Sequence, residues 1–143
     1  MTILENKKLV EKYPFFKLDE DYKYTMLDDM PEGWRKAFGD KFCEELLDAV
    51  KKADLLDDFK IIQIKEKFGA LRVYSNKYTD EIFDLFNKYE TLSETICIEC
   101  GKPATKITLG WISPYCDNCI PKNSDGTEVD NKLIKDFNTM IGN

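Results

Sequence analysis

The chain has 143 residues, 43% of them hydrophobic, which is enough for one domain with a core of its own and excludes general disorder. Its 27 acidic residues outnumber its 21 basic ones, and the resulting net charge of −6 disfavours non-specific binding to duplex DNA. The sequence contains no histidine, which excludes Ser-His and Cys-His nucleophile pairs and histidine proton shuttles.

Two helices are predicted in the first 50 residues. Thr2 is a typical N-cap residue and Pro14 is a helix stop, so the charged segment between them is predicted to form a short helix. Residues 31–50 carry apolar side chains about four positions apart, which predicts a longer helix with one buried stripe. The stripe consists of Trp34, Phe38, Phe42, Leu46, Ala49 and Val50.

Residues 59–76 alternate apolar and polar side chains and are predicted to form a β-hairpin. A two-residue turn at Gly69-Ala70 places Lys67 directly opposite Arg72. One face of the hairpin then carries apolar residues together with Glu66. The other face carries Gln63, Lys65, Lys67, Arg72 and Tyr74.

Two further helices are predicted in the second half of the chain. Residues 79–92 begin with acidic side chains, which favour a helix N-terminus, and continue with an apolar stripe. The stripe consists of Ile82, Phe83, Phe86 and Tyr89. Beyond a polar loop, residues 129–141 are predicted to form a short amphipathic helix built on Leu133, Ile134, Phe137 and Ile141.

Four of the five cysteines form two Cys-x-x-Cys pairs, Cys97 with Cys100 and Cys116 with Cys119. This spacing is typical of a Cys₄ zinc site, and four thiolates leave no open position, so we expect one structural Zn²⁺ per chain. Two disulfides or four unrelated thiols are the alternatives. The N-terminus is too charged for a signal peptide, which favours the reducing cytoplasm, where disulfides are rare. Cys43 is expected to be a partly buried apolar residue.

The cations of the predicted hairpin gather on one face of an otherwise acidic chain. Lysine opposite arginine is mildly destabilising, and a bound anion would relieve the repulsion. An arginine fork, lysine charges and the ring of Tyr74 suit a phosphate or carboxylate group. We therefore expect Gln63, Lys65, Lys67, Arg72 and Tyr74 to bind a small anionic ligand such as a nucleotide. The alternative is a solvated strand face that nearby acidic helices neutralise.

Glu66 is unusual because it falls on the apolar face of the predicted hairpin. A buried, unpaired carboxylate costs several kcal/mol. Glu66 must therefore reach an edge, pair with a cation or accept hydrogen bonds from backbone N–H groups. A role as a general base is the further alternative.

The string "KEKFGALRVY" at residues 65–74, followed by "CIECGKPA" and "YCDNC", resembles a family of small, largely uncharacterised proteins from bacteriophages, prophages and bacteria. The shared pattern is KEKFG-x-L-R-x-Y with a C-terminal Cys-rich unit, and it covers about residues 33–120. The resemblance implies an origin rather than a mechanism. It carries over the four paired cysteines and the hairpin residues Lys65, Glu66, Lys67, Phe68, Gly69, Leu71, Arg72 and Tyr74.

The expected fold is α+β, with a small antiparallel sheet, packed helices and a C-terminal zinc ribbon. Residues 1–95 are expected to form the α+β core and residues 96–122 the zinc ribbon. Residues 123–143 are expected to form a polar loop and a C-terminal helix that packs back on the core.

Several classes of function are compatible with this fold. The first is a non-enzymatic protein that binds a small anionic, nucleotide-like ligand. If the chain is phage-encoded, it would act in the host cytoplasm and could sequester a host defence signal. The second is an inhibitor or adaptor that binds a host protein through its acidic surface. A nucleic-acid-binding ribbon is disfavoured by the charge, and an enzyme by the closed Cys₄ site and the lack of histidine.

Overall fold

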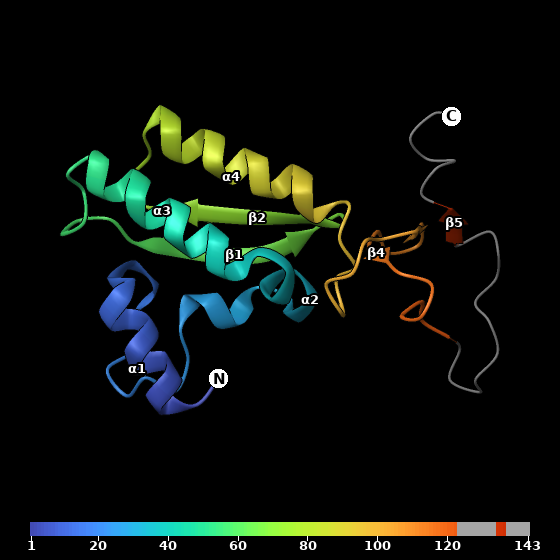
Figure 1. Cartoon of the computed structure of the whole chain (residues 1–143), viewed down its shortest axis with the longest axis horizontal. Helices are drawn as coiled ribbons and strands as arrows, with labels where there is room; N and C mark the ends of the chain where they lie inside the picture. Colours follow the sequence, from blue (N-terminus) through green and yellow to red (C-terminus); the bar gives the residue numbers. More distant parts are fainter. Residues whose placement is uncertain (123–133, 137–143) are drawn as a thin grey trace.

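A two-stranded antiparallel sheet, β1 (Ile61–Lys67) and β2 (Ala70–Ser75), organises the computed structural model, which describes residues 1–122 and 134–136. Helices α3 (Asp40–Lys52) and α4 (Asp80–Ser93) lie along one side of this hairpin, and α1 (Ile3–Lys12) lies on the other (Figure 1). The expected α+β class with a small antiparallel sheet is therefore confirmed.

The two N-terminal helices begin and end close to where the sequence predicts them. Thr2 caps α1 in a reciprocal arrangement with Glu5, and the helix ends before Pro14. The second helical run begins with α2 (Glu32–Trp34), passes through a π-helical turn at Arg35–Gly39 and continues as α3. All six residues of the predicted apolar stripe are buried in the core: Trp34, Phe38, Phe42, Leu46, Ala49 and Val50.

Helix α4 packs against β2 and α3. Thr79 caps it by accepting a hydrogen bond from the Ile82 backbone N–H, so the helix begins at Asp80, within the predicted range. The buried face consists of Ile82, Phe86, Tyr89 and Ser93. The prediction that Phe83 belongs to this face is wrong, because its side chain is 55% exposed. Buried positions recur three or four residues apart, and Phe83 is one position out of phase with them.

The hairpin turn consists of Phe68 and Gly69, with φ angles of 53° and 82°. Positive φ at both central residues is the requirement of a type I′ turn, whose twist matches that of the flanking strands. Phenylalanine rarely adopts this conformation, and for that reason the sequence favours a turn one residue later.

The register of the hairpin differs from the predicted one. Lys67 pairs with Ala70, and Arg72 pairs with Lys65. The prediction that Lys67 lies opposite Arg72 is therefore wrong. From Gln63 to Lys67 each partner moves by two positions along β2, so these side chains keep their predicted faces. The prediction that Ile62 lies on the apolar face is wrong, because a bulge between Ile61 and Gln63 breaks the alternation: Ile62 is 59% exposed and Ile61 is buried instead. The like-charged cross-strand pair exists, but it is Lys65 with Arg72.

The cysteine-containing unit lies at the end of the core that carries the hairpin turn (Figure 1). Strands β3 (Lys106–Thr108) and β4 (Pro114–Tyr115) form an antiparallel hairpin between the two cysteine pairs. A third strand, β5 (Ile134–Asp136), pairs antiparallel with β3. These three residues are therefore not helical, contrary to the prediction for 129–141. The other residues of that predicted helix lie outside the described part of the chain.

A search of the helices within residues 1–122 and 134–136 identifies none that is long and apolar enough to cross a membrane.

Candidate metal centre and basic hairpin

The four paired cysteines converge on one point. Their sulfur atoms all lie within 4.8 Å of one another, and the Sγ atoms of Cys100 and Cys116 are 3.6 Å apart. Zn–S bonds of about 2.3 Å in a tetrahedron place sulfurs about 3.8 Å apart. None of these cysteines forms a disulfide. The geometry is therefore that of a set of four sulfur ligands that could hold one metal ion.

The backbone around each pair makes the tight turns that direct two sulfurs to one point. The Gly101 N–H donates to the Cys97 carbonyl at 3.0 Å, and the Cys119 N–H donates to the Cys116 carbonyl at 3.2 Å. Gly101 has a φ of 85°, a conformation that favours glycine.

The proximity of the sulfurs changes their acidity. Burial alone would raise the pKa of Cys116, but hydrogen bonds from Cys119 and Cys100 outweigh it and lower that pKa to about 7. Burial, together with hydrogen bonding to Cys116, Cys100 and Cys97, raises the pKa of Cys119. The opposite directions of the two shifts follow from the close packing of the sulfurs, because adjacent negative charges repel one another.

Two glycines allow the cluster to approach the core closely. A Cβ atom on Gly33 would lie 2.3 Å from the Cys97 carbonyl oxygen, and one on Gly101 would lie 2.6 Å from the Gly33 carbonyl oxygen. The Gly33 N–H also donates to the Ile98 carbonyl at 2.9 Å. The start of the long helix therefore contacts the first cysteine turn backbone to backbone. Helical periodicity gives no signal for this role of Gly33.

The cluster also contacts the tip of the β1–β2 hairpin. A Cβ atom on Gly69 would lie 3.0 Å from the Ile112 side chain and 3.1 Å from its carbonyl oxygen. Ile112 belongs to the segment between β3 and β4. The cysteine unit therefore packs against both the helix start and the turn that sets the hairpin register.

Cys43 lies apart from this cluster, in the hydrophobic core under α3. Its side chain is 2% exposed, and burial raises its pKa to about 12. The thiol is therefore neutral and inaccessible, as expected for a cysteine that packs as a small apolar residue.

The five predicted ligand-binding residues lie on one face of the hairpin. Gln63 pairs with Tyr74 and Lys65 pairs with Arg72, and Lys67 follows nearer the turn. The Lys65 ammonium lies 5.7 Å from the centre of the Tyr74 ring, a cation–π distance. The structure thus brings four of the five predicted residues into two adjacent cross-strand pairs and leaves Lys67 beside Ala70.

Arg72 has an acidic partner on a neighbouring helix, as the alternative of a solvated face neutralised by acidic helices expects. Its Nη1 lies 2.5 Å from Oε1 of Glu90 on α4, and this carboxylate offsets much of the repulsion from Lys65. The Nε of Arg72 is buried and has no hydrogen-bond partner among the described residues. Because Nε is enclosed, a ligand would reach Arg72 through the exposed part of its guanidinium, and the side chain is 39% exposed.

Glu66 has a structural contact that accounts for its position. Its Oε1 accepts a 2.7 Å hydrogen bond from the Gly69 backbone N–H. Of the expected alternatives, the structure therefore shows the hydrogen bond to a backbone N–H. The carboxylate holds the turn in its left-handed conformation.

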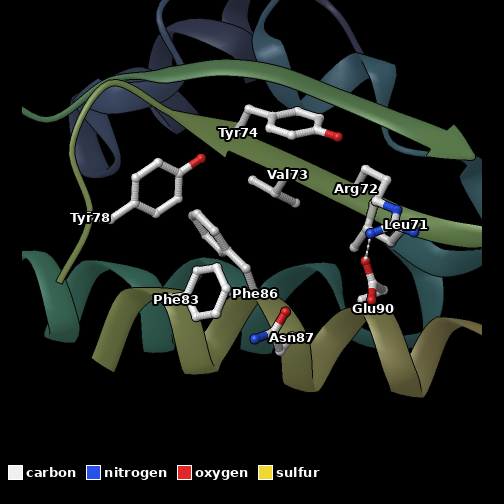
Figure 2. Close-up of a pocket in the computed structure, with 9 residues that line it drawn as sticks. All are labelled: Leu71, Arg72, Val73, Tyr74, Tyr78, Phe83, Phe86, Asn87 and Glu90. Carbon is white, nitrogen blue, oxygen red and sulfur yellow. Dashed lines mark ion pairs between the residues drawn. The ribbon is translucent and has the colours of Figure 1, made fainter. Parts of the chain in front are cut away.

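A groove of about 250 Å³ lies between β2 and α4, beside the basic face. Figure 2 shows that aromatic side chains gather at one end of it, and Arg72 and Glu90 at the other. Phe83, the residue predicted to be buried, lines this groove. The complete lining is Leu71, Arg72, Val73, Tyr74, Tyr78, Phe83, Phe86, Asn87 and Glu90.

Comparisons with known proteins give no match: no family model, no curated protein and no solved structure is similar to this chain.

Proposed function

We propose that this chain is a non-enzymatic zinc protein that binds a small anionic, nucleotide-like ligand at the hairpin. The observation that carries the proposal is the position of Arg72. It lies on the basic face opposite Lys65 and also lines the groove between β2 and α4. A ligand with a charged group and a flat ring can therefore contact the cations and the groove at once.

Zinc is the ion that suits the four cysteines best. Four thiolates in a tetrahedron match its preference for sulfur, and they leave no position for water or substrate. The site is therefore structural. The short strands β3 and β4 between the pairs fit a zinc ribbon. A small unit of this kind depends on its metal for stability.

Lys65 and Arg72 are the central pair of the proposed anion site. They are direct cross-strand partners, and both side chains are partly exposed. Tyr74 lies beside Lys65 and offers its ring for stacking. Lys67, beside Ala70 at the turn, belongs to the outer part of the site and is expected to contribute less.

The resemblance to phage and prophage proteins adds a biological setting to this proposal. A phage protein that binds a nucleotide without turning it over could sequester a signal of the host defence system. Such a protein would act in the host cytoplasm. The competing proposal is an adaptor that binds a basic partner through acidic residues. A second groove, between α3 and α4, contains Glu45 and Glu81, but Glu45 pairs with Lys88 and Glu81 with Lys52. These carboxylates are therefore less available to a basic partner.

A thermal-shift screen of the zinc-loaded protein against nucleotides and cyclic dinucleotides tests the ligand proposal. A ligand at 100 times its dissociation constant stabilises the fold by about 2.7 kcal/mol. At least one member of the panel should raise the melting temperature. The rise should be lost in Lys65→Gln and Arg72→Gln, and kept in Lys41→Gln, an exposed lysine on α3. No rise with any member, or a rise that survives both changes, contradicts the proposal.

A further inference from the structure

Along the outer edge of β2, a single outward-pointing N–H is left without a partner among the described residues. In an antiparallel pair, successive residues direct their backbone N–H and C=O groups alternately toward and away from the partner strand. The N–H of Leu71 donates outward to Ser93 Oγ at 2.8 Å, and the N–H of Ser75 donates outward to the Tyr78 hydroxyl at 3.1 Å. Val73 lies between them and therefore has the same outward direction.

The outward backbone groups of Val73 have no hydrogen-bond partner within the described part of the chain. The outward N–H groups of its two neighbours are taken by side chains of α4 and of the segment before it. An added β-strand uses the outward N–H groups of successive alternate residues, and two of the three are already taken here. Val73 therefore offers one donor and one acceptor side by side, which suits a small molecule better than a peptide strand.

These two backbone groups face the groove between β2 and α4. Val73 is among the lining residues, and Figure 2 shows it between Tyr78 at one end and Arg72 at the other. Phe86 is buried and Phe83 and Tyr78 are largely exposed, so apolar rings line the groove beside the polar edge. A volume of about 250 Å³ suits one ring system, since pockets for drug-sized ligands start at about 300 Å³.

The charged end of the groove is the edge of the proposed anion site. Glu90 pairs with Nη1 of Arg72, but the Arg72 side chain is 39% exposed, so part of its guanidinium stays within reach of an anion. A ring bound at Val73 would hold its attached anionic arm toward Arg72 and Lys65. The ring site and the anion site can therefore be filled by the two halves of one ligand.

We propose that the groove binds a heteroaromatic ring with an adjacent hydrogen-bond donor and acceptor, as in a nucleobase, paired with the backbone N–H and C=O of Val73. This inference rests on the proposed function and identifies the class of ring it requires. Backbone groups recognise the donor–acceptor edge common to nucleobases, and the aromatic side chains supply stacking surface.

Calorimetric titration with matched ligands tests the ring separately from the anion. The probes are the four common nucleoside 5′-monophosphates and ribose 5-phosphate, which has the same anionic arm without a base. At least one nucleotide should bind tenfold or more tightly than ribose 5-phosphate. Equal binding of ribose 5-phosphate and all four nucleotides overturns the ring inference and leaves the proposed anion site intact.

Two variants test whether the groove is the source of the higher affinity for the nucleotide than for ribose 5-phosphate. Asn87→Phe fills the groove from an exposed position on α4 and should remove the advantage of the nucleotide over ribose 5-phosphate. Thr91→Phe introduces the same side chain at an exposed position of α4 that does not line the groove, and should keep the advantage. An advantage that survives Asn87→Phe places the ring elsewhere and overturns the inference. No binding of any probe, ribose 5-phosphate and inorganic pyrophosphate included, overturns both proposals.

Discussion

The indole Nε1 of Trp34 donates a 3.0 Å hydrogen bond to the carbonyl oxygen of Ile96. Trp34 is fully buried in the core, and Ile96 directly precedes Cys97, the first of the four clustered cysteines. The buried indole N–H of Trp34 therefore holds the backbone directly before the first clustered cysteine in place. Together with the close approach of Gly33 to Cys97, this bond couples the candidate metal centre to the hydrophobic core.

Trp34→Phe should destabilise the protein substantially. The substitution leaves a carbonyl without its donor and a void beside it, which together cost at least about 2 kcal/mol. Denaturant unfolding measures the loss. Trp111→Phe is the matched control, because Trp111 is 44% exposed, and it should change stability by less than about 0.5 kcal/mol. Similar losses in the two variants would show that the Trp34 contact has no special role.

Gly33→Ala should disrupt the contact between the long helix and the first cysteine turn. The added Cβ would meet a backbone oxygen at 2.3 Å, and backbone cannot give way as a flexible side chain can. Gly39→Ala in the same helical run meets only the Arg35 side chain, at 3.1 Å, so we expect little loss or a small gain from helix propensity. Circular dichroism melts compare the two. A Gly33→Ala protein as stable as Gly39→Ala would contradict the close approach.

Replacing Phe68 with a residue that favours a positive φ should stabilise the hairpin turn. Phe68 has a positive φ and is 70% exposed, so its ring contributes little packing. Asparagine adopts this conformation more readily, and Phe68→Asn should stabilise the fold by about 0.5–1 kcal/mol. Gly69→Ala should destabilise it, because its φ is 82° and Ile112 blocks the Cβ position. A loss of stability in Phe68→Asn would indicate that the ring makes a contact of its own.

Glu90 should compete with a bound anion for Arg72. Glu90→Gln removes the negative charge that lies 2.5 Å from the guanidinium, so the variant should bind ribose 5-phosphate or pyrophosphate more tightly, by about threefold or more. Glu94→Gln is a control of equal charge change at the end of the same helix. Calorimetry at fixed salt concentration measures both. Weaker binding by Glu90→Gln would mean that Glu90 positions Arg72 for the ligand instead of competing with it.

The sequence predicts the features that follow from a simple period. The helical stripe that contains Trp34 and Phe42 is buried as expected, and the hairpin faces are correct from Gln63 to the turn because alternation survives a shift of two positions. The bulge that exposes Ile62 gives no signal in the alternating pattern. The local signals fail where tertiary contacts decide. Phe68 adopts a left-handed conformation in a turn that Glu66 caps. Phe83 is exposed because it lies beside a groove between two elements.

Local sequence patterns also do not predict which residues contact the proposed functional side chains. The pairing of Arg72 with Glu90 joins residues 18 positions apart, and nothing in the spacing indicates it. The contact between Gly33 and Gly101 likewise joins two segments that only the fold brings together. In contrast, the cysteine cluster was predictable, because four ligands for one metal impose a spacing that appears in the sequence itself.

The claim on which the rest of the account depends is that Cys97, Cys100, Cys116 and Cys119 hold one zinc ion. Elemental analysis combined with native mass spectrometry of protein purified without chelator tests it most directly. The account predicts one zinc per chain with no disulfide, unchanged in Cys43→Ala and lost or strongly weakened in Cys100→Ser. Zinc-free protein, disulfides among these four cysteines, or loss of metal in Cys43→Ala would contradict it.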